Sequence, residues 1–119
     1  MTLTREEILA MEPGKKLNIA VATNVFNWKL ELRSGYVENN WITENGLVDI
    51  NMWNPSEDIS AAWEVAEKFN QFDVMKAKGW EKQYDCRIWV GITGDQWAAQ
   101  GKTAPEAICK VALLAVLNL

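Results

Sequence analysis

Three aspartates are the residues of this sequence best suited to acid–base chemistry. Asp49 and Asp85 fall in segments that alternate like β-strands, and Asp58 lies at the expected start of a helix. Paired carboxylates can support hydrolysis when one donates a proton and the other activates water. No motif fixes the geometry of these three. The simpler interpretation is a solvent-facing carboxylate or, for Asp58, a cap at the positive end of a helix.

Residue types disfavour other catalytic chemistry. The 119 residues include no histidine, the commonest general base and metal ligand. Cys86 and Cys109 are the two cysteines, and two thiols without spaced partners do not make a zinc site. A nucleophilic Cys86 needs an electropositive setting, but the adjacent Arg87 points to the opposite face of a strand. The sequence therefore predicts a protein that is not an enzyme, with no metal and no cofactor.

Tryptophan is unusually abundant, with seven in the chain. Arg87, Trp89 and Trp97 fall in one predicted hairpin, and Trp53 ends a possible neighbouring strand. Indoles beside a guanidinium can form a stacking and anion-binding surface for a nucleotide or a peptide. These four residues are the candidate binding site. The competing interpretation, which we favour at this stage, is that a second layer of helices covers them.

Helical spacing and capping residues predict four helices. Thr4 caps the first, over residues 4–11, and a longer one follows over residues 15–27. Ser56 or Asp58 caps a third, in which Trp63 is expected to pack inward. Thr103 caps the last, which is apolar nearly all round. Because one sheet face cannot cover such a helix, we expect a homo-oligomer.

Alternation of apolar and polar residues predicts the strands. Residues 29–53 are expected to form two or three antiparallel strands. In the stretch "QYDCRIWVGI", Cys86 and Ile88 share one face and Arg87 and Trp89 the other, and a turn at residues 93–95 leads into a returning strand. The order predicts a single α+β domain over residues 1–119, with helices on both faces of one antiparallel sheet.

Net charge and hydropathy limit the kinds of partner that the protein can have. The net charge of −4 disfavours binding to nucleic acid. The hairpin and the helix after it resemble the end of a double-stranded-RNA-binding domain, but only Lys102 is placed to grip phosphate. No apolar run is long enough to span a membrane, and no secretory signal opens the chain. We expect a cytoplasmic protein with reduced thiols.

Three segments together resemble a known family. "TREEILAMEPGKKLNIAVATNVFNW", "PSEDISAAWEVAEKF" and "TAPEAICKVALLAVL" look like the phage ABA sandwich domain, found in bacteriophages and prophages. The resemblance implies a three-layer alpha-beta-alpha sandwich and a phage origin, and it implies no established activity or site residues. We expect a phage accessory protein that binds a host or phage protein. The alternative is a small-molecule binder that sequesters a nucleotide-like host signal through Arg87 and the nearby tryptophans.

Overall fold

The computed structural model describes residues 3–31, 40–90 and 95–119. Helices and antiparallel strands alternate along these parts of the chain. In order they are α1 (Arg5–Ala10), α2 (Lys15–Asn24), β1 (Lys29–Glu31), β2 (Asn40–Thr43), β3 (Gly46–Asp49), the short 3-10 helix η1 (Ile50–Met52), α3 (Ile59–Ala66), β4 (Gln71–Lys76), β5 (Tyr84–Val90), β6 (Asp95–Gly101) and α4 (Ala104–Leu117). The predicted turn at residues 93–95 lies mostly outside the described residues.

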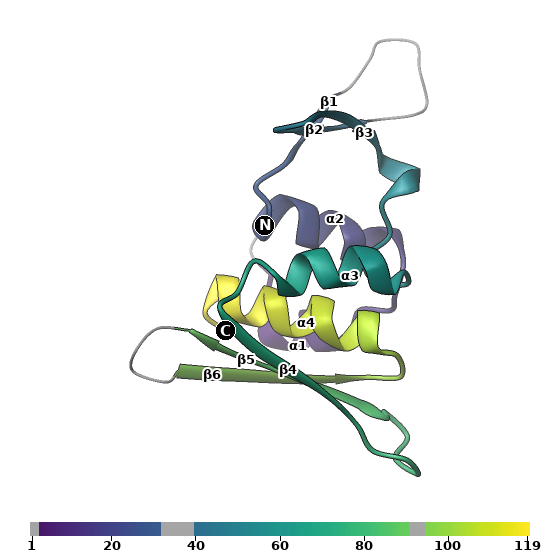
Figure 1. Ribbon diagram of the computed structural model, residues 1–119, viewed down its shortest axis with the longest axis vertical. Helices are drawn as coiled ribbons and strands as arrows, with labels where there is room; N and C mark the ends of the chain where they lie inside the picture. Colours follow the sequence, from purple (N-terminus) through teal and green to yellow (C-terminus); the bar gives the residue numbers. More distant parts are fainter. Residues whose placement is uncertain (1–2, 32–39, 91–94) are drawn as a thin grey trace.

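The strands form two three-stranded antiparallel sheets, ordered β1-β2-β3 and β4-β5-β6. Figure 1 shows the helices between them, with α4 and α1 above the β4–β6 sheet and the small sheet beyond α2 and α3. The α+β class was therefore predicted correctly, whereas the single sheet with helices on both faces was not. The reason is that η1 and α3 lie between β3 and β4 along the chain. This connection crosses the helical layer, so β4 begins a second sheet on the other side of the helices.

Helix α4 is the centre of the core. The Thr103 side chain caps it by accepting a hydrogen bond from the Glu106 main-chain N–H at 3.3 Å. All residues from Pro105 to Leu114 are buried within one copy of the chain. The β4–β6 sheet covers one side of α4, and the other three helices cover the rest (Figure 1). The reason given for expecting a homo-oligomer, that one copy of the chain leaves α4 uncovered, is therefore wrong. The oligomeric state itself stays a prediction.

The caps were predicted well and the helix ends less well. Thr4 and Glu7 form the expected capping box at α1, and Asp58 rather than Ser56 caps α3 through the Ser60 N–H. Helix α2 ends at Asn24, earlier than residue 27, and Asn27 adopts a left-handed backbone with φ of 57°. Asparagine tolerates this conformation better than most residues, so it turns the chain out of the helix.

Helix α3 and strand β4 differ most from the expectation. The buried face of α3 consists of three alanines and Val65, while Trp63 is 44% exposed and does not pack inward. Its ring meets Phe72 edge-on, with 5.3 Å between ring centroids. Phe72 belongs to β4, a strand that was not predicted although Phe72 and Val74 alternate with polar residues. The indole of Trp63 therefore lies over the edge of the sheet rather than inside the core.

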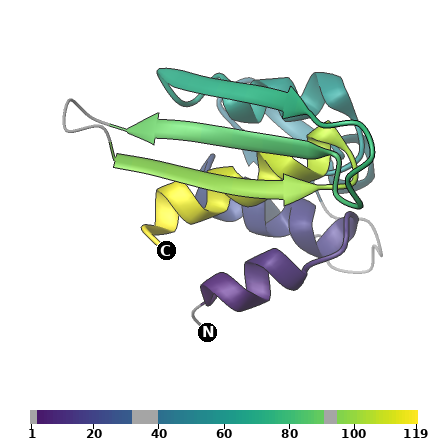
Figure 2. The same cartoon turned by 90° about the horizontal axis from the view of Figure 1, so that it is seen from below.

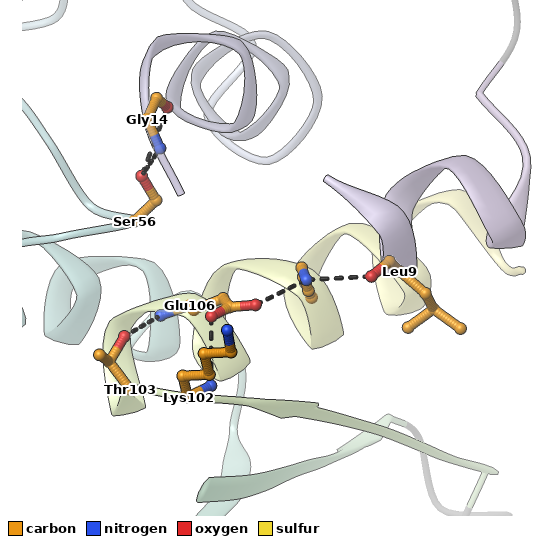
Figure 3. A network of polar contacts seen from close by, with 7 residues as sticks. Leu9, Gly14, Ser56, Lys102, Thr103 and Glu106 are labelled. Carbon is orange, nitrogen blue, oxygen red and sulfur yellow. Dashed lines mark hydrogen bonds and ion pairs between the residues drawn. The ribbon is translucent and has the colours of Figure 1, made fainter. Parts of the chain in front are cut away.

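Buried polar groups hold the helices in place. The Glu106 carboxylate accepts a hydrogen bond of 3.2 Å from the Lys102 main-chain N–H (Figure 3). It accepts a second hydrogen bond, of 2.7 Å, from Lys110 Nζ. Separately, Ser56 Oγ accepts a hydrogen bond of 2.8 Å from the Gly14 N–H (Figure 3). This contact ties the start of α2 to the segment before α3. The hydrogen bonds of Glu106 and Ser56 give partners to polar groups that would otherwise be buried without one.

Candidate functional site

Trp53 belongs to an aromatic cluster between the small sheet and the helices. It is 7% exposed, and its ring centroid lies 4.7 Å from that of Trp28 and 5.3 Å from that of Phe26. Its Nε1 donates to the Glu64 carboxylate at 3.4 Å. Trp41, 1% exposed, extends the cluster through Trp28. Trp53 is therefore a packing residue, far along the chain and in the fold from the predicted hairpin.

Trp97 lies on the inner face of the β4–β6 sheet, the face turned toward α4. It pairs directly with Ile88 of β5, and paired residues project from the same side of a sheet. Ile88 is fully buried, and Trp97 packs against the same core. The structure thus separates Trp97 from Arg87 and Trp89, which project from the other side of β5.

Arg87 and Trp89 stand together on the outer face of the sheet, the face turned away from α4. Strand β5 is the central strand, so both residues have neighbours on either side. Asp73 and Ala98 flank Arg87, and Gln71 and Gln96 flank Trp89. Of the four predicted site residues, only these two share a surface.

An ion pair orients Arg87 on this face. Its Nε donates to Oδ2 of Asp85 at 3.0 Å, and the two side chains are 47% and 9% exposed, respectively. The nearly buried carboxylate holds one edge of the guanidinium, and the rest of the group stays in solvent. A guanidinium held in this way loses little side-chain entropy when it meets another group.

No helix covers the outer face in the parts of the chain that the structure describes. Figure 2 shows the three strands with α2, α3 and α4 on their far side and α1 beside the edge formed by β6. The favoured expectation, that a second helix layer buries Arg87 and Trp89, is therefore wrong. An antiparallel sheet can leave one face in water because its side chains alternate between core and solvent. Trp89, half-buried, is nevertheless a large apolar group for such a face.

The three aspartates considered for acid–base chemistry lie on separate elements. Asp49 accepts a hydrogen bond of 2.8 Å from the Asn51 N–H at the start of η1, Asp58 caps α3, and Asp85 pairs with Arg87. Each therefore has a structural role. Among the described residues, no cluster of cysteines and carboxylates could hold a metal ion.

Both cysteine thiols are buried and held in the protonated form. Burial, aided by the charges of Asp73 and Asp85, raises the pKa of Cys86 to about 12. Burial also raises the pKa of Cys109. Because the thiolate is the reactive form, neither cysteine is suited to nucleophilic chemistry. Neither forms a disulfide.

Two hollows lie elsewhere on the surface. A groove of about 1040 Å³ lies between α1 and α2. A smaller hollow of about 280 Å³ lies between α1 and the β4–β6 sheet, and its lining residues include Arg5, Lys82 and Asp85. Neither contains an indole. The larger groove was not predicted, because the apolar spacing of α1 and α2 indicates only that each helix packs by one face. The exposed Lys15 and Lys16 at the start of α2 were the available signal.

These features define a small α+β domain whose described residues contain no recognisable catalytic constellation. The sequence pattern of the phage ABA sandwich domain matches residues 19–113, and the chain belongs to this family. A phage protein from Bacillus cereus ATCC 14579, known from a 2.0 Å crystal structure, is similar, with 29% sequence identity over 90% of this chain and 94% of that chain and a TM-score of 0.67. No curated protein matches the chain. The family predicted from the three segments is confirmed, and neither match names an activity or a ligand.

Proposed function

We propose that the protein is a non-catalytic phage accessory protein that binds a host or phage protein through the outer face of its β4–β6 sheet. Arg87 and Trp89 form the centre of this surface. The observation that supports the proposal most is their position, side by side on the central strand of an uncovered sheet. Tryptophan and arginine are the residues that most often dominate binding energy at protein interfaces.

The surroundings of the two residues suit protein binding. The indole of Trp89 offers a flat apolar face, and Arg87 offers a charge already oriented by Asp85. Both side chains project from strands, so a partner meets a rigid surface and orders few groups on binding. The flanking glutamines, Gln71 and Gln96, supply hydrogen-bonding groups around the indole.

The area of the outer sheet face limits the affinity expected for a protein partner. Three strands of about seven residues cover roughly 350 Å² in projection, less than the roughly 800 Å² per partner of a standard interface. A partner must therefore also contact the sheet edge, where Met75 of β4 is about half exposed, or bind only transiently. The described helices include none long and apolar enough to cross a membrane. We place the interaction in the host cytoplasm, where buried thiols stay reduced.

The rival function, binding of a nucleotide-like small molecule, has less support. Such a ligand calls for an enclosed pocket that covers most of its surface, with indoles to stack on it and a cation at one end. Arg87 and Trp89 instead stand on an open sheet face, Trp53 is buried in another layer, and Trp97 faces the core.

Affinity purification from phage-infected host lysate tests the proposal. The wild-type protein is compared with Arg87→Ala/Trp89→Ala and with Lys78→Ala/Trp80→Ala, a matched cation and indole pair exposed near the turn between β4 and β5. We expect a discrete polypeptide with the wild type and the matched control. The Arg87/Trp89 variant should bind it about 30-fold more weakly, since interface hot spots contribute about 2 kcal/mol. Equal recovery with all three proteins, or a co-purifying nucleotide lost with Arg87, would overturn it.

A further inference from the structure

The groove between α1 and α2 has an apolar floor that no other described segment covers. Leu3, Met11 and Ile19 line it and are only half-buried, and its volume is about 1040 Å³. Figure 2 shows α1 and α2 as neighbouring helices on the same side of the large sheet, joined by a short turn. Apolar side chains left half-buried in an open groove are available for contact with another molecule.

Charges of opposite sign flank this floor. Glu7 of α1 and Glu12 of the turn supply the acidic side, and Lys15 and Lys16 in the first turn of α2 supply the basic side. All four side chains are exposed. Within the described ranges, none of them forms an ion pair with another residue. Glu7 Oε1 accepts a hydrogen bond of 3.2 Å from the Thr4 N–H, so the groove presents acidic and basic groups without ion-pair partners beside half-buried apolar side chains.

Such a surface is complementary to itself. When two copies face each other across a two-fold axis, the acidic side of each meets the basic side of the other, and the two apolar floors meet between them. Two helix pairs that meet face to face pack as a four-helix bundle does. We propose that the groove between α1 and α2 is the self-association face of a homodimer, and that its ligand is a second copy of this chain.

The size of the groove predicts a weak dimer. Helix α2 has ten residues, which span about 15 Å. Two such short helix pairs bury less surface than a standard interface, so the dissociation constant should be on the order of 10 to 100 µM. The groove is a different surface from the outer face of the β4–β6 sheet. The protein can therefore fail to dimerise and still bind its partner, or fail to bind the partner and still dimerise.

Charge exchange between two variants tests this proposal. Sedimentation velocity is run on the purified protein from about 1 µM to about 1 mM, the range that spans weak association. We expect a concentration-dependent dimer for the wild type. Lys15→Glu/Lys16→Glu should weaken it at least tenfold, and so should Glu12→Lys, because each puts like charges opposite each other. An equal mixture of these two variants should form a heterodimer more tightly than either forms a homodimer.

Controls separate association from folding. Glutamate in the first turn of α2 is favourable for the helix, so Lys15→Glu/Lys16→Glu should fold at least as well as the wild type. Lys78→Glu/Lys102→Glu makes the same change of charge outside the groove and should dimerise like the wild type. A wild-type monomer at every concentration overturns the proposal. So does a dimer that the groove variants leave unchanged, or a mixture that gains nothing over its components.

Discussion

The Nζ of Lys110 in α4 donates a hydrogen bond of 3.0 Å to the main-chain carbonyl oxygen of Leu9 in α1. The same Nζ lies 2.7 Å from Oε2 of Glu106, one turn earlier in α4, and the two side chains are only 3% and 7% exposed. Carbonyl groups in the last turn of a helix lack partners within that helix. A buried cation from the central helix supplies one here and fixes where α1 docks.

Replacing this cation should destabilise the fold strongly. Lys110→Met leaves the buried Glu106 carboxylate without its counter-charge and the Leu9 carbonyl without its donor. We expect the free energy of unfolding to fall by about 3–5 kcal/mol, as when one partner of a buried ion pair is removed. Urea unfolding measures it. Lys110→Met/Glu106→Gln should recover part of the loss, because no unpaired charge remains. A single variant as stable as the wild type would contradict this account of the pair.

The contact between β6 and the start of α4 leaves no room for a side chain at Gly101. A Cβ there would lie 2.8 Å from the Ala107 nitrogen and 3.0 Å from both Glu106 Cβ and the Thr103 oxygen. Gly101→Ala should therefore force α4 away from the sheet and cost about 1–3 kcal/mol, the usual penalty of overpacking. Thermal unfolding measures it, with Gln100→Ala at the exposed neighbouring position as the control. Equal melting temperatures for the two variants would show that the helix start can shift freely.

Alkaline pH should weaken the fold through its buried thiols. Burial raises the pKa of Cys86 from 9.0 to about 12, so above about pH 9 the unfolded chain loses this proton while the folded chain keeps it. The thiol's contribution is fully present below pH 9 and is lost as the pH rises toward 12, at about 1.4 kcal/mol per pH unit. Cys86→Ala should unfold in urea with a shallower decline of stability between about pH 8.5 and pH 10.5. Identical slopes for wild type and variant would contradict the raised pKa.

Local patterns in the sequence predicted local structure. The caps at Thr4 and Thr103 follow from hydroxyl and carboxylate side chains placed three residues apart. Alternation along β5 correctly assigned Cys86 and Ile88 to one face and Arg87 and Trp89 to the other. These features depend on neighbours along the chain, so the residues themselves carry the information.

Long-range features could not be predicted in the same way. Trp97 faces the core because it pairs with Ile88, a register that the turn between the strands sets and that alternation alone does not. Trp28 and Trp53 lie before and after the small sheet along the chain, and their rings meet only because of how this sheet folds. The division into two sheets and the cover over α4 likewise depend on where whole elements pack. The structure therefore places two of the four candidate residues together on one surface and the other two in the core, and a role in binding stays a prediction.

Photo-crosslinking at Gln96 tests the proposed binding surface most directly. Gln96 is exposed and pairs with Trp89 on the outer face of the sheet, so a photoreactive residue there borders the proposed site. In phage-infected cells we expect a crosslink from position 96 to a discrete polypeptide, lost when Arg87 is also replaced by alanine. The same residue placed at Glu57, exposed just before α3, should give no such product. A crosslink from position 57 alone, or none from position 96, would contradict protein binding through this sheet face.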